Sequence, residues 1–321
     1  MNALNLKNIA LPIVAAPMFL ISGPDLVIAG SKAGIPTLFP SANARTSEIL
    51  EHWLKEISAQ ISIVEDAPWG VNLNTHRLNP RLEADLALTV NYQAPLVVTA
   101  LGAPTAIVEA VHSYGGLVLA DVTSVYHAKK AVSSGVDALV LVCGGAGGHT
   151  GQLSPFAFVN EVRQFWSGAI LLAGAVTTGN DVAKALALGA DYAYMGTRFI
   201  ATQESMAKDT YRRMIEASNA DDIVCTNSFT GIPNNMLRPS IRAAGIDPDN
   251  IPTTELTGIN FKDPHDGAKA WRDIWSAGQG VGSIKSSPSV LDVVSELERE
   301  FTQALNNLSA KLQGLKDQFS K

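Results

Sequence analysis

The sequence predicts an α/β protein: an eight-stranded (β/α)8 TIM barrel that carries a small helical cap subdomain and a long C-terminal helix. Short apolar runs alternate with helical patterns, which is typical of a parallel sheet covered on both faces. Eight such units recur within roughly 190 residues, the number that closes a barrel. The first run ends in Ala16-Pro17-Met18 without a glycine fingerprint, which disfavours an open dinucleotide-binding sheet.

The strands are predicted from short apolar runs that end in small or polar residues. They cover residues 12–18, 35–40, 69–73, 96–101, 117–123, 138–142, 169–175 and 192–199. Proline fits the first turn of a helix, and Pro24, Pro104 and Pro155 each begin a helical pattern. The helices between the strands are expected at 24–33, 47–57, 80–92, 104–112, 125–133, from Pro155 onward, and at 180–188.

The pattern changes after the last strand. Residues 1–217 are predicted to form the barrel domain, which ends in a helix at 208–217. Residues 218–287 combine a helical segment at 237–244 with turn-rich sequence, so we expect a helical cap over the barrel mouth. Residues 288–321 place apolar side chains at spacings of three and four, which predicts one long amphipathic helix. We expect this helix to pack on its own barrel; a homodimer contact through its end is the alternative.

Composition and charge exclude several classes of function. Hydrophobic residues make up 46% of the 321 residues and charged ones 17%, which fits a well-buried core. The net charge is −6 and no Lys/Arg cluster could follow a phosphate backbone, so no nucleic-acid partner is expected. The two cysteines, Cys143 and Cys225, lack metal-ligand spacing and favour a reducing compartment. Without a signal-peptide pattern or a membrane-spanning apolar run, we expect a cytoplasmic protein.

A glycine-rich loop follows the sixth strand, with the sequence Cys143-Gly144-Gly145-Ala146-Gly147-Gly148-His149-Thr150-Gly151. Glycine lets the backbone approach a ligand closely and present its N–H groups. On a barrel, the loops after the strands form the active-site face, so His149 would point toward the chemistry. The alternative is a flexible turn with a solvated histidine.

Other strand ends carry small or polar residues. Asn72 ends the third strand and could bind a ring edge through its amide. Gly174 and Ala175 after the seventh strand, and Gly196 and Thr197 after the eighth, would leave backbone N–H groups open to phosphate oxygens. Asparagine and Gly-Thr pairs also form ordinary tight turns.

Weaker candidates for substrate contact lie near these strand ends. His76 follows Asn72 and should lie at the mouth, although an exposed loop histidine fits it as well. Ser276 and Gln279 lie where the cap could meet a ligand. No His, Cys, Asp or Glu spacing suggests a metal site.

Together these motifs resemble the nitronate monooxygenase family, formerly called 2-nitropropane dioxygenases, and the resemblance extends over essentially the whole chain. It is carried by Gly70-Val71-Asn72-Leu73, Gly145-Ala146-Gly147-Gly148-His149-Thr150-Gly151, Ala187-Leu188-Gly189-Ala190-Asp191, Met195-Gly196-Thr197-Arg198-Phe199 and Ile274-Trp275-Ser276-Ala277-Gly278-Gln279-Gly280.

The resemblance implies an FMN-dependent TIM barrel that oxidises alkyl nitronates with O2 to carbonyl compounds and nitrite. It places the catalytic histidine at His149, as an active-site base or orienting group. The flavin contacts it implies fall on Pro17, Met18, Phe19, Asn72, Gly147, Ala173, Gly174, Ala175, Gly196 and Thr197, with Asp121 near the flavin.

Three departures from the family pattern bear on this site. Ala15-Ala16-Pro17-Met18 replaces the Gln-Gly-Gly-Met seen in many relatives after the first strand. Asp121 stands where some members have a lysine, which affects flavin tuning and substrate charge preference. Ala175 replaces a glycine, and we expect a backbone donor to tolerate this change if its φ is negative.

Other functions stay open. The same fold and cofactor could serve as an NAD(P)H:quinone reductase or an FMN-dependent enoyl-ACP reductase. A flavin-free aldolase-type lyase or isomerase is disfavoured, because no lysine at a strand end could form a Schiff base. A purely binding protein gives no purpose to a histidine on a glycine loop.

Overall fold

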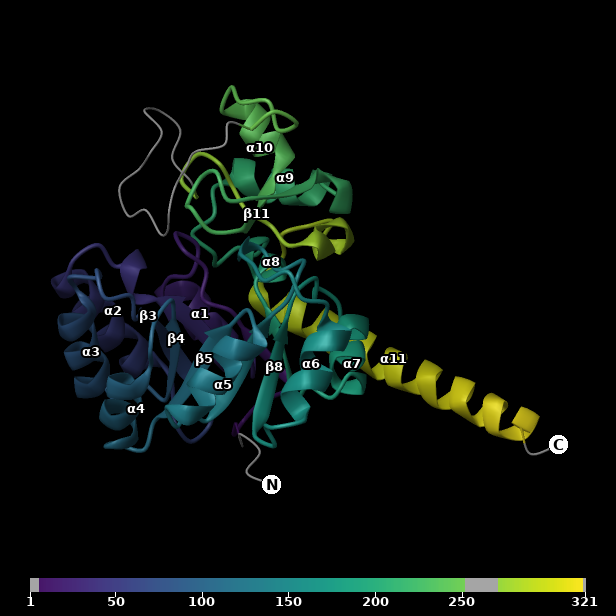
Figure 1. The fold of residues 1–321 in the computed structure, drawn as a ribbon, viewed down its shortest axis with the longest axis horizontal. Helices are drawn as coiled ribbons and strands as arrows, with labels where there is room; N and C mark the ends of the chain where they lie inside the picture. The colour runs from purple at the N-terminus through teal and green to yellow at the C-terminus, as the bar shows by residue number, and fades with distance from the viewer. Residues whose placement is uncertain (1–5, 252–270, 320–321) are drawn as a thin grey trace.

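The computed structural model describes residues 6–251 and 271–319, and these contain the expected closed parallel barrel (Figure 1). Its strand order is β1-β2-β3-β4-β5-β6-β8-β9, and β9 pairs with β1 to close the cylinder. The fold prediction is therefore confirmed. The barrel strands are β1 (Ile13–Ala15), β2 (Thr37–Pro40), β3 (Trp69–Asn74), β4 (Leu96–Ala100), β5 (Leu117–Val122), β6 (Ala138–Val142), β8 (Ala169–Ala173) and β9 (Tyr192–Met195).

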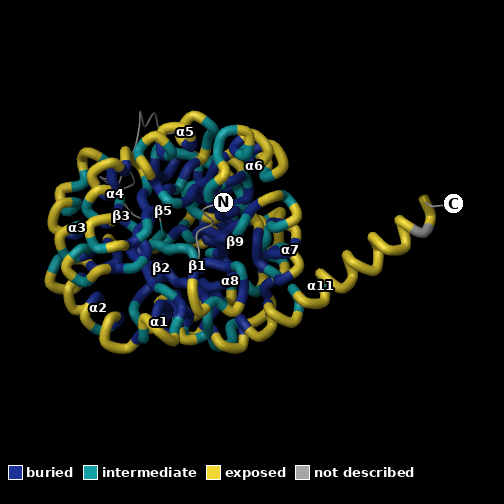
Figure 2. Tube along the Cα trace, turned by 90° about the horizontal axis from the view of Figure 1, so that it is seen from below, coloured by how far each residue is buried: buried dark blue, intermediate teal, exposed yellow. Residues whose placement is uncertain are grey.

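Helices surround the barrel, with exposed outer faces and buried inner faces (Figure 2). Thr46, Ser124 and Thr178 cap α2, α5 and α7 through side-chain oxygens that accept backbone N–H groups. No described helix is both long and apolar enough to cross a bilayer. The surrounding helices are α1 (Pro24–Lys32), α2 (Ser47–Gln60), α3 (Leu82–Asn91), α4 (Thr105–His112), α5 (Val125–Ser133), α6 (Pro155–Arg163) and α7 (Gly179–Ala187); the 3-10 turn η1 (Ser41–Asn43) follows β2.

Alternation along each strand divides the core into two shells. In β6, Leu139 and Leu141 pack outward against the helices, whereas Ala138 and Val140 point into the barrel. The same period of two sends Tyr192 and Tyr194 of β9 inward. Side chains at the last inward position of each strand therefore form the floor of the barrel mouth.

The cap above the mouth is not purely helical, which corrects the sequence prediction. The short strand β7 (Gly148–His149) in the glycine loop pairs with β11 (Asn234–Leu237), and β11 pairs with β10 (Ile223–Thr226), to form a three-stranded antiparallel sheet. Residues 252–270 of the expected cap lie outside the described part of the chain. The remaining elements are α8 (Thr197–Ile200), α9 (Asp209–Ala217), η2 (Ala220–Asp222), α10 (Arg238–Ala243) and η3 (Gln279–Ser283).

The eighth predicted strand is too long at its C-terminal end. The strand stops at Met195, and the chain turns at Gly196 into α8. Thr197, Arg198 and Phe199 are all buried on that short helix, so their burial comes from helical packing and not from strand pairing.

The C-terminal helix α11 (Val290–Phe319) packs on the barrel only in part. This corrects the expectation that the helix packs on its own barrel. Its first turns bury Val290, Val293, Val294 and Leu297, mainly against α7. The helix then extends away from the body of the protein (Figure 1). Its distal apolar stripe is exposed: Leu305 44%, Leu308 43%, Leu312 49%, Leu315 39% and Phe319 82%.

Gly179 allows α11 to dock on α7. A Cβ at this position would lie 2.2 Å from the Leu297 carbonyl oxygen and 2.4 Å from the Phe301 nitrogen, both backbone atoms that cannot rotate away. We predict that Gly179→Ala lowers unfolding stability by about 1–3 kcal/mol through overpacking, measured by chemical denaturation. Gly314→Ala on the same helix is the control, because a Cβ there meets nothing within 4 Å. Equal effects of the two changes would contradict this account of the contact.

Candidate active site

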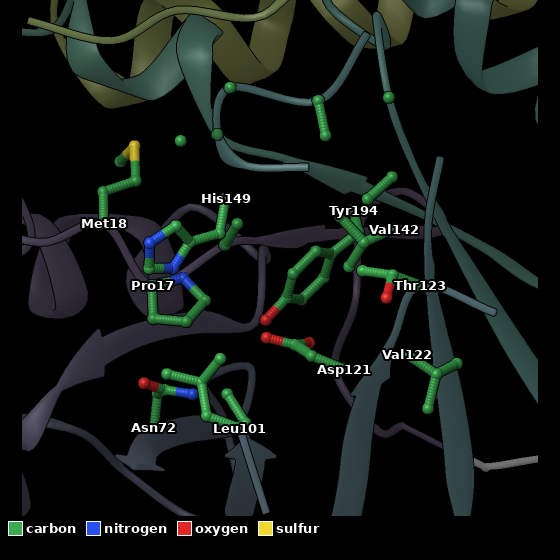
Figure 3. Close-up of a pocket in the computed structure, with 18 of the residues that line it drawn as sticks. Pro17, Met18, Asn72, Leu101, Asp121, Val122, Thr123, Val142, His149 and Tyr194 are labelled. Carbon is green, nitrogen blue, oxygen red and sulfur yellow. The ribbon is translucent and has the colours of Figure 1, made fainter. Parts of the chain in front are cut away.

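A cavity of about 1500 Å³ opens at the carboxyl ends of the barrel strands, beneath the cap. The cavity contains every residue that the sequence proposed as a flavin contact, together with His149 (Figure 3). These residues come from segments spread from the first strand to the last, and only barrel closure brings them together. The lining includes Pro17, Met18, Phe19, Asn72, Asp121, Gly147, His149, Ala173, Gly174, Ala175, Gly196 and Thr197.

His149 is held on strand β7 rather than on a free loop tip. Its backbone pairs with Asn234 of β11, and the Thr150 hydroxyl donates to the Cys143 carbonyl at 3.1 Å. The imidazole lies edge-on to the Trp271 ring, with centroids 5.1 Å apart. A solvated, flexible histidine is therefore not what the structure shows.

Burial lowers the pKa of His149 to about 4, because desolvation disfavours the imidazolium. The ring is therefore neutral near pH 7, and its Nε2 is buried without a hydrogen-bond partner among the described residues. A neutral imidazole with an unused ring nitrogen can accept a proton from a ligand in the cavity or hydrogen-bond to it.

The glycine loop is packed closely against the segment before η3. A Cβ at Gly147 would lie 2.7 Å from the Gly278 nitrogen, so this position requires glycine. The Gln279 nitrogen donates to the Gly145 carbonyl at 2.9 Å, and the Asn235 amide donates to the Ala146 carbonyl at 2.7 Å. These contacts fix the loop that carries His149.

The ends of β8 and β9 lie on one side of the cavity, as expected for a phosphate site. Gly174 has φ 131°, and Ala175 has φ 55°, in the left-handed region. The condition under which alanine was expected to be tolerated, a negative φ at Ala175, is therefore not met, and the Ala175 N–H donates to the Gly145 carbonyl at 3.3 Å. The Thr197 hydroxyl accepts the Gly278 N–H at 2.9 Å, so Thr197 also ties the cap segment to the barrel.

The first and third strands complete the cavity wall. After β1, Asn43 holds the turn through its amide, which donates to the Met18 carbonyl at 3.0 Å, and through its oxygen, which accepts the Leu20 N–H at 2.8 Å. Phe19 contacts the Trp271 ring edge-on at 6.0 Å. The Asn72 amide donates to the Val98 carbonyl at 3.2 Å, so one of its two N–H donors is used within the barrel.

Of the three weaker candidates for substrate contact, only one lines the cavity. Ser276 lines the cavity, and its carbonyl accepts the Tyr211 hydroxyl. His76 is not among the lining residues; its backbone N–H bonds to the Asn74 side chain at 2.9 Å. Gln279 is exposed and also lies outside the lining.

Two site residues were missed by the sequence reasoning. Tyr194 points from β9 toward the Asp121 carboxyl group (Figure 3), and Trp271 covers the His149 ring. The alternation of side chains along β9 could have indicated that Tyr194 points inward. A tyrosine that points into a barrel brings its hydroxyl into the core or the mouth. Nothing in the local sequence around Trp271 indicated its position.

Fold and site together define a TIM-barrel enzyme whose chemistry occurs at the carboxyl ends of the strands. The described part of the chain holds no group of three or more His, Cys, Asp or Glu side chains placed to bind a metal. The cavity instead combines an apolar wall with a few converging polar groups, as organic ligand sites do.

Comparison with known proteins identifies the family. Residues 77–300 match the nitronate monooxygenase family. A Mycobacterium tuberculosis protein assigned as a monooxygenase is 30% identical over 76% of this chain and 68% of its own length. A nitronate monooxygenase of Paraburkholderia phytofirmans is 28% identical over 95% and 96% of the two chains. The structure of a FabK mutant from Thermotoga maritima superposes with a TM-score of 0.77 at 25% identity, covering 94% of this chain and 96% of that one.

The chain belongs to the nitronate monooxygenase family, and it is a flavin oxidoreductase of that type. The resemblance found in the sequence motifs is therefore confirmed.

Ala175 is expected to be strained, since a left-handed conformation costs a non-glycine residue about 1–2 kcal/mol. We predict that Ala175→Gly raises unfolding stability by about 1 kcal/mol, measured by denaturant titration of the ligand-free protein. Ala173→Gly is the control: this neighbour is buried and its φ is not positive, so the same change should destabilise. A loss of stability in both variants would show that Ala175 is not strained.

Proposed function

We propose that the protein binds FMN in this cavity and uses O2 to oxidise alkyl nitronates to carbonyl compounds and nitrite. The observation that carries the proposal is the neutral His149 ring in the wall of a cavity lined by all the expected flavin contacts. The size of the cavity supports it, since about 1500 Å³ exceeds the roughly 300–1,000 Å³ of ordinary small-molecule sites and leaves room for a tricyclic cofactor and a substrate.

The residues present fit FMN. Gly174 and Gly196 offer glycine backbone at the ends of β8 and β9 for the phosphate, and Met18 and Asn72 lie beside the space for the ring. Three buried polar atoms, on Asp121, His149 and Tyr194, have no partner among the residues that the structure describes and are available to a polar ring edge or to substrate. When bound, FMN supplies the electron acceptor and the site of reaction with O2.

His149 has two roles in the proposal. For a neutral nitroalkane, its unprotonated ring takes the α-proton, as general-base catalysis requires. For a nitronate that is already anionic, its ring orients the nitro group by hydrogen bonding. Trp271 limits the rotation of the imidazole in both cases, because the two rings meet edge to face.

The cap shields this chemistry from water. Strand β11 holds β7 from above, and Ala277 and Gly278 pack on the glycine loop. Ala277 is fully buried. A site closed in this way strengthens hydrogen bonds to a charged ligand, because the local dielectric is low.

The alternative function keeps FMN and changes the electron donor to NAD(P)H, with a quinone or an enoyl-ACP as acceptor. The likeness to FabK is the observation that favours it. Anaerobic mixing of the FMN-loaded protein with NADH separates the two functions. Rapid bleaching of the flavin would support the reductase, and oxygen uptake with propyl-nitronate would support the monooxygenase.

We predict that His149→Ala lowers kcat/KM for a neutral nitroalkane by roughly 10²–10⁴-fold, the usual contribution of a general base, with a smaller loss for the preformed nitronate. FMN content, read from the visible spectrum, should be unchanged. His52→Ala is the control, since His52 is exposed on α2. Equal losses with both substrates would argue against proton abstraction by His149.

We also propose that the protein is a homodimer that pairs the distal stripe of α11 with the same stripe of a second copy. Leu305, Leu308, Leu312, Leu315 and Phe319 follow the alternating three-and-four spacing of a coiled-coil seam, which another helix covers. In an antiparallel pair of these helices, each copy buries the stripe of the other through the same contacts, as two-fold symmetry requires.

The dimer proposal predicts that replacing Leu308 and Leu312 by Asp converts the protein to a monomer in light scattering coupled to gel filtration. The barrel should keep its FMN affinity, because the stripe lies outside the cavity. Gln303→Asp is the control, as Gln303 lies on the same helix outside the stripe. A wild-type protein that elutes as a monomer at micromolar concentration would contradict the proposal.

A further inference from the structure

Two acidic groups face each other in the floor of the cavity. Asp121 is the penultimate residue of β5 and lies at an inward position, and Tyr194 reaches toward it from β9, so that the hydroxyl points at the carboxyl group (Figure 3). The Asp121 Oδ1 and the Tyr194 hydroxyl are both buried, and neither has a hydrogen-bond partner in the described part of the chain. Both residues line the cavity that also contains His149.

Among residues 6–251 and 271–319, no positively charged group balances this pair. Across the neighbouring strands, Asp121 is aligned with Val140 of β6, and Ala120 with Thr99 of β4; none of these carries a charge. From the other directions the nearby polar groups are Asn72 of β3, which is uncharged, and His149 of β7, which is neutral near pH 7.

Helix α5 contributes basic residues to the outer lining of the cavity but not to its floor. His127, Lys129 and Lys130 line that part. The two lysine ammonium groups lie over the rings of Phe165 and Tyr126, at 5.3 Å and 4.6 Å. The charge state of Asp121 is therefore decided by its burial.

Burial alone raises the pKa of Asp121 to about 7. The pKa of Tyr194 is raised first by burial and then by the negative charge of Asp121. Ionisation of the aspartate therefore opposes ionisation of the tyrosine, so the tyrosine stays protonated when the aspartate ionises. The pair is neutral in mildly acidic solution and carries one negative charge in mildly alkaline solution.

We propose that Asp121 and Tyr194 form an acid pair whose ionisation state sets the charge in the wall of the flavin cavity and thereby the reduction potential of the bound flavin. The proposal rests on the proposed binding of FMN in this cavity. A carboxylate beside the ring disfavours added electrons, so the potential of the wild-type protein should fall more steeply with pH than that of a variant with a permanently neutral side chain. Asp121 is thus a tuning residue, not a proton donor to substrate.

The first experiment needs no cofactor. In the unfolded chain an aspartate ionises near pH 3.9, whereas folded Asp121 stays protonated until about pH 7, so folding opposes ionisation throughout that window. Unfolding stability of the ligand-free wild type should therefore fall, relative to Asp121→Asn, as pH rises from 4 to 7, with no further change above. Equal pH profiles for the two proteins would overturn the proposal.

The Tyr194→Phe variant tests whether Tyr194 affects the ionisation of Asp121. Loss of the hydroxyl leaves the carboxyl group facing an apolar ring, so the upper end of the pH range over which stability falls should move to higher pH. Tyr192→Phe is the matched control, an inward tyrosine of the same strand that does not face Asp121. Tyr192→Phe should leave unchanged the pH range over which unfolding stability falls, even if it lowers stability at every pH. An unchanged window in Tyr194→Phe would remove Tyr194 from the pair.

The second experiment measures the midpoint potential of protein-bound FMN from pH 5.5 to 9. Wild type and Asp121→Asn should agree at the acid end. At the alkaline end, the wild type should bind reduced FMN about tenfold more weakly, relative to oxidised FMN, than the variant does, which is about 30 mV for a two-electron couple. A difference that is constant across the range would overturn the proposal.

The two experiments separate this inference from the proposed function. If the protein does not bind FMN, the proposed function fails and the claim about the potential fails with it. The shared ionisation of the pair then stands or falls on the stability profiles alone. If FMN binds and the profiles agree with Asp121→Asn at every pH, the proposed function survives and the acid pair does not.

Discussion

The pairing of β1 with β9 is the contact on which the site depends. The register aligns Val14 with Tyr194 and Ala15 with Met195, which closes the cylinder and places the loop after β1 beside the turn at Gly196. A closed parallel barrel has a single carboxyl-terminal rim, so every strand delivers its last inward residue to one mouth. Without this closure, Met18, Asn72 and Gly196 would have no common cavity.

A second, smaller sheet decides where His149 lies. Strand β7 belongs to the barrel loop by sequence, but its hydrogen bonds run to β11 in the cap. The Asn235 amide and the backbone around Gly278 hold the same loop from two further directions. The glycines of this loop serve mainly to let cap and barrel approach closely, since a Cβ at Gly147 or Gly278 would collide with backbone. The histidine is therefore positioned by packing between two sheets.

The mouth of the barrel contains buried polar groups that lower the stability of the folded protein. Asp121, His149 and Tyr194 each bury a polar atom that no described residue satisfies, and Ala175 adopts a conformation that favours glycine. Such features are costly and cluster at functional sites, where a ligand or a reaction uses them. The remainder of the barrel is conventional by comparison, with aliphatic residues both inside and outside the strands.

The sequence alone determined the barrel, because eight nearly continuous apolar runs alternating with helical patterns can bury both faces of the strands only as a parallel sheet wrapped in helices. It also determined the family and the residues of the mouth, since strand ends are local features and the barrel rule maps them to one face. Tertiary structure decided what local patterns cannot encode: the pairing of β7 with the cap, the sign of φ at Ala175, the exit of α11 from the body after its first turns, and the approach of Tyr194 to Asp121. Each of these depends on contacts between segments far apart in the chain, and such contacts leave no periodic signal in either segment.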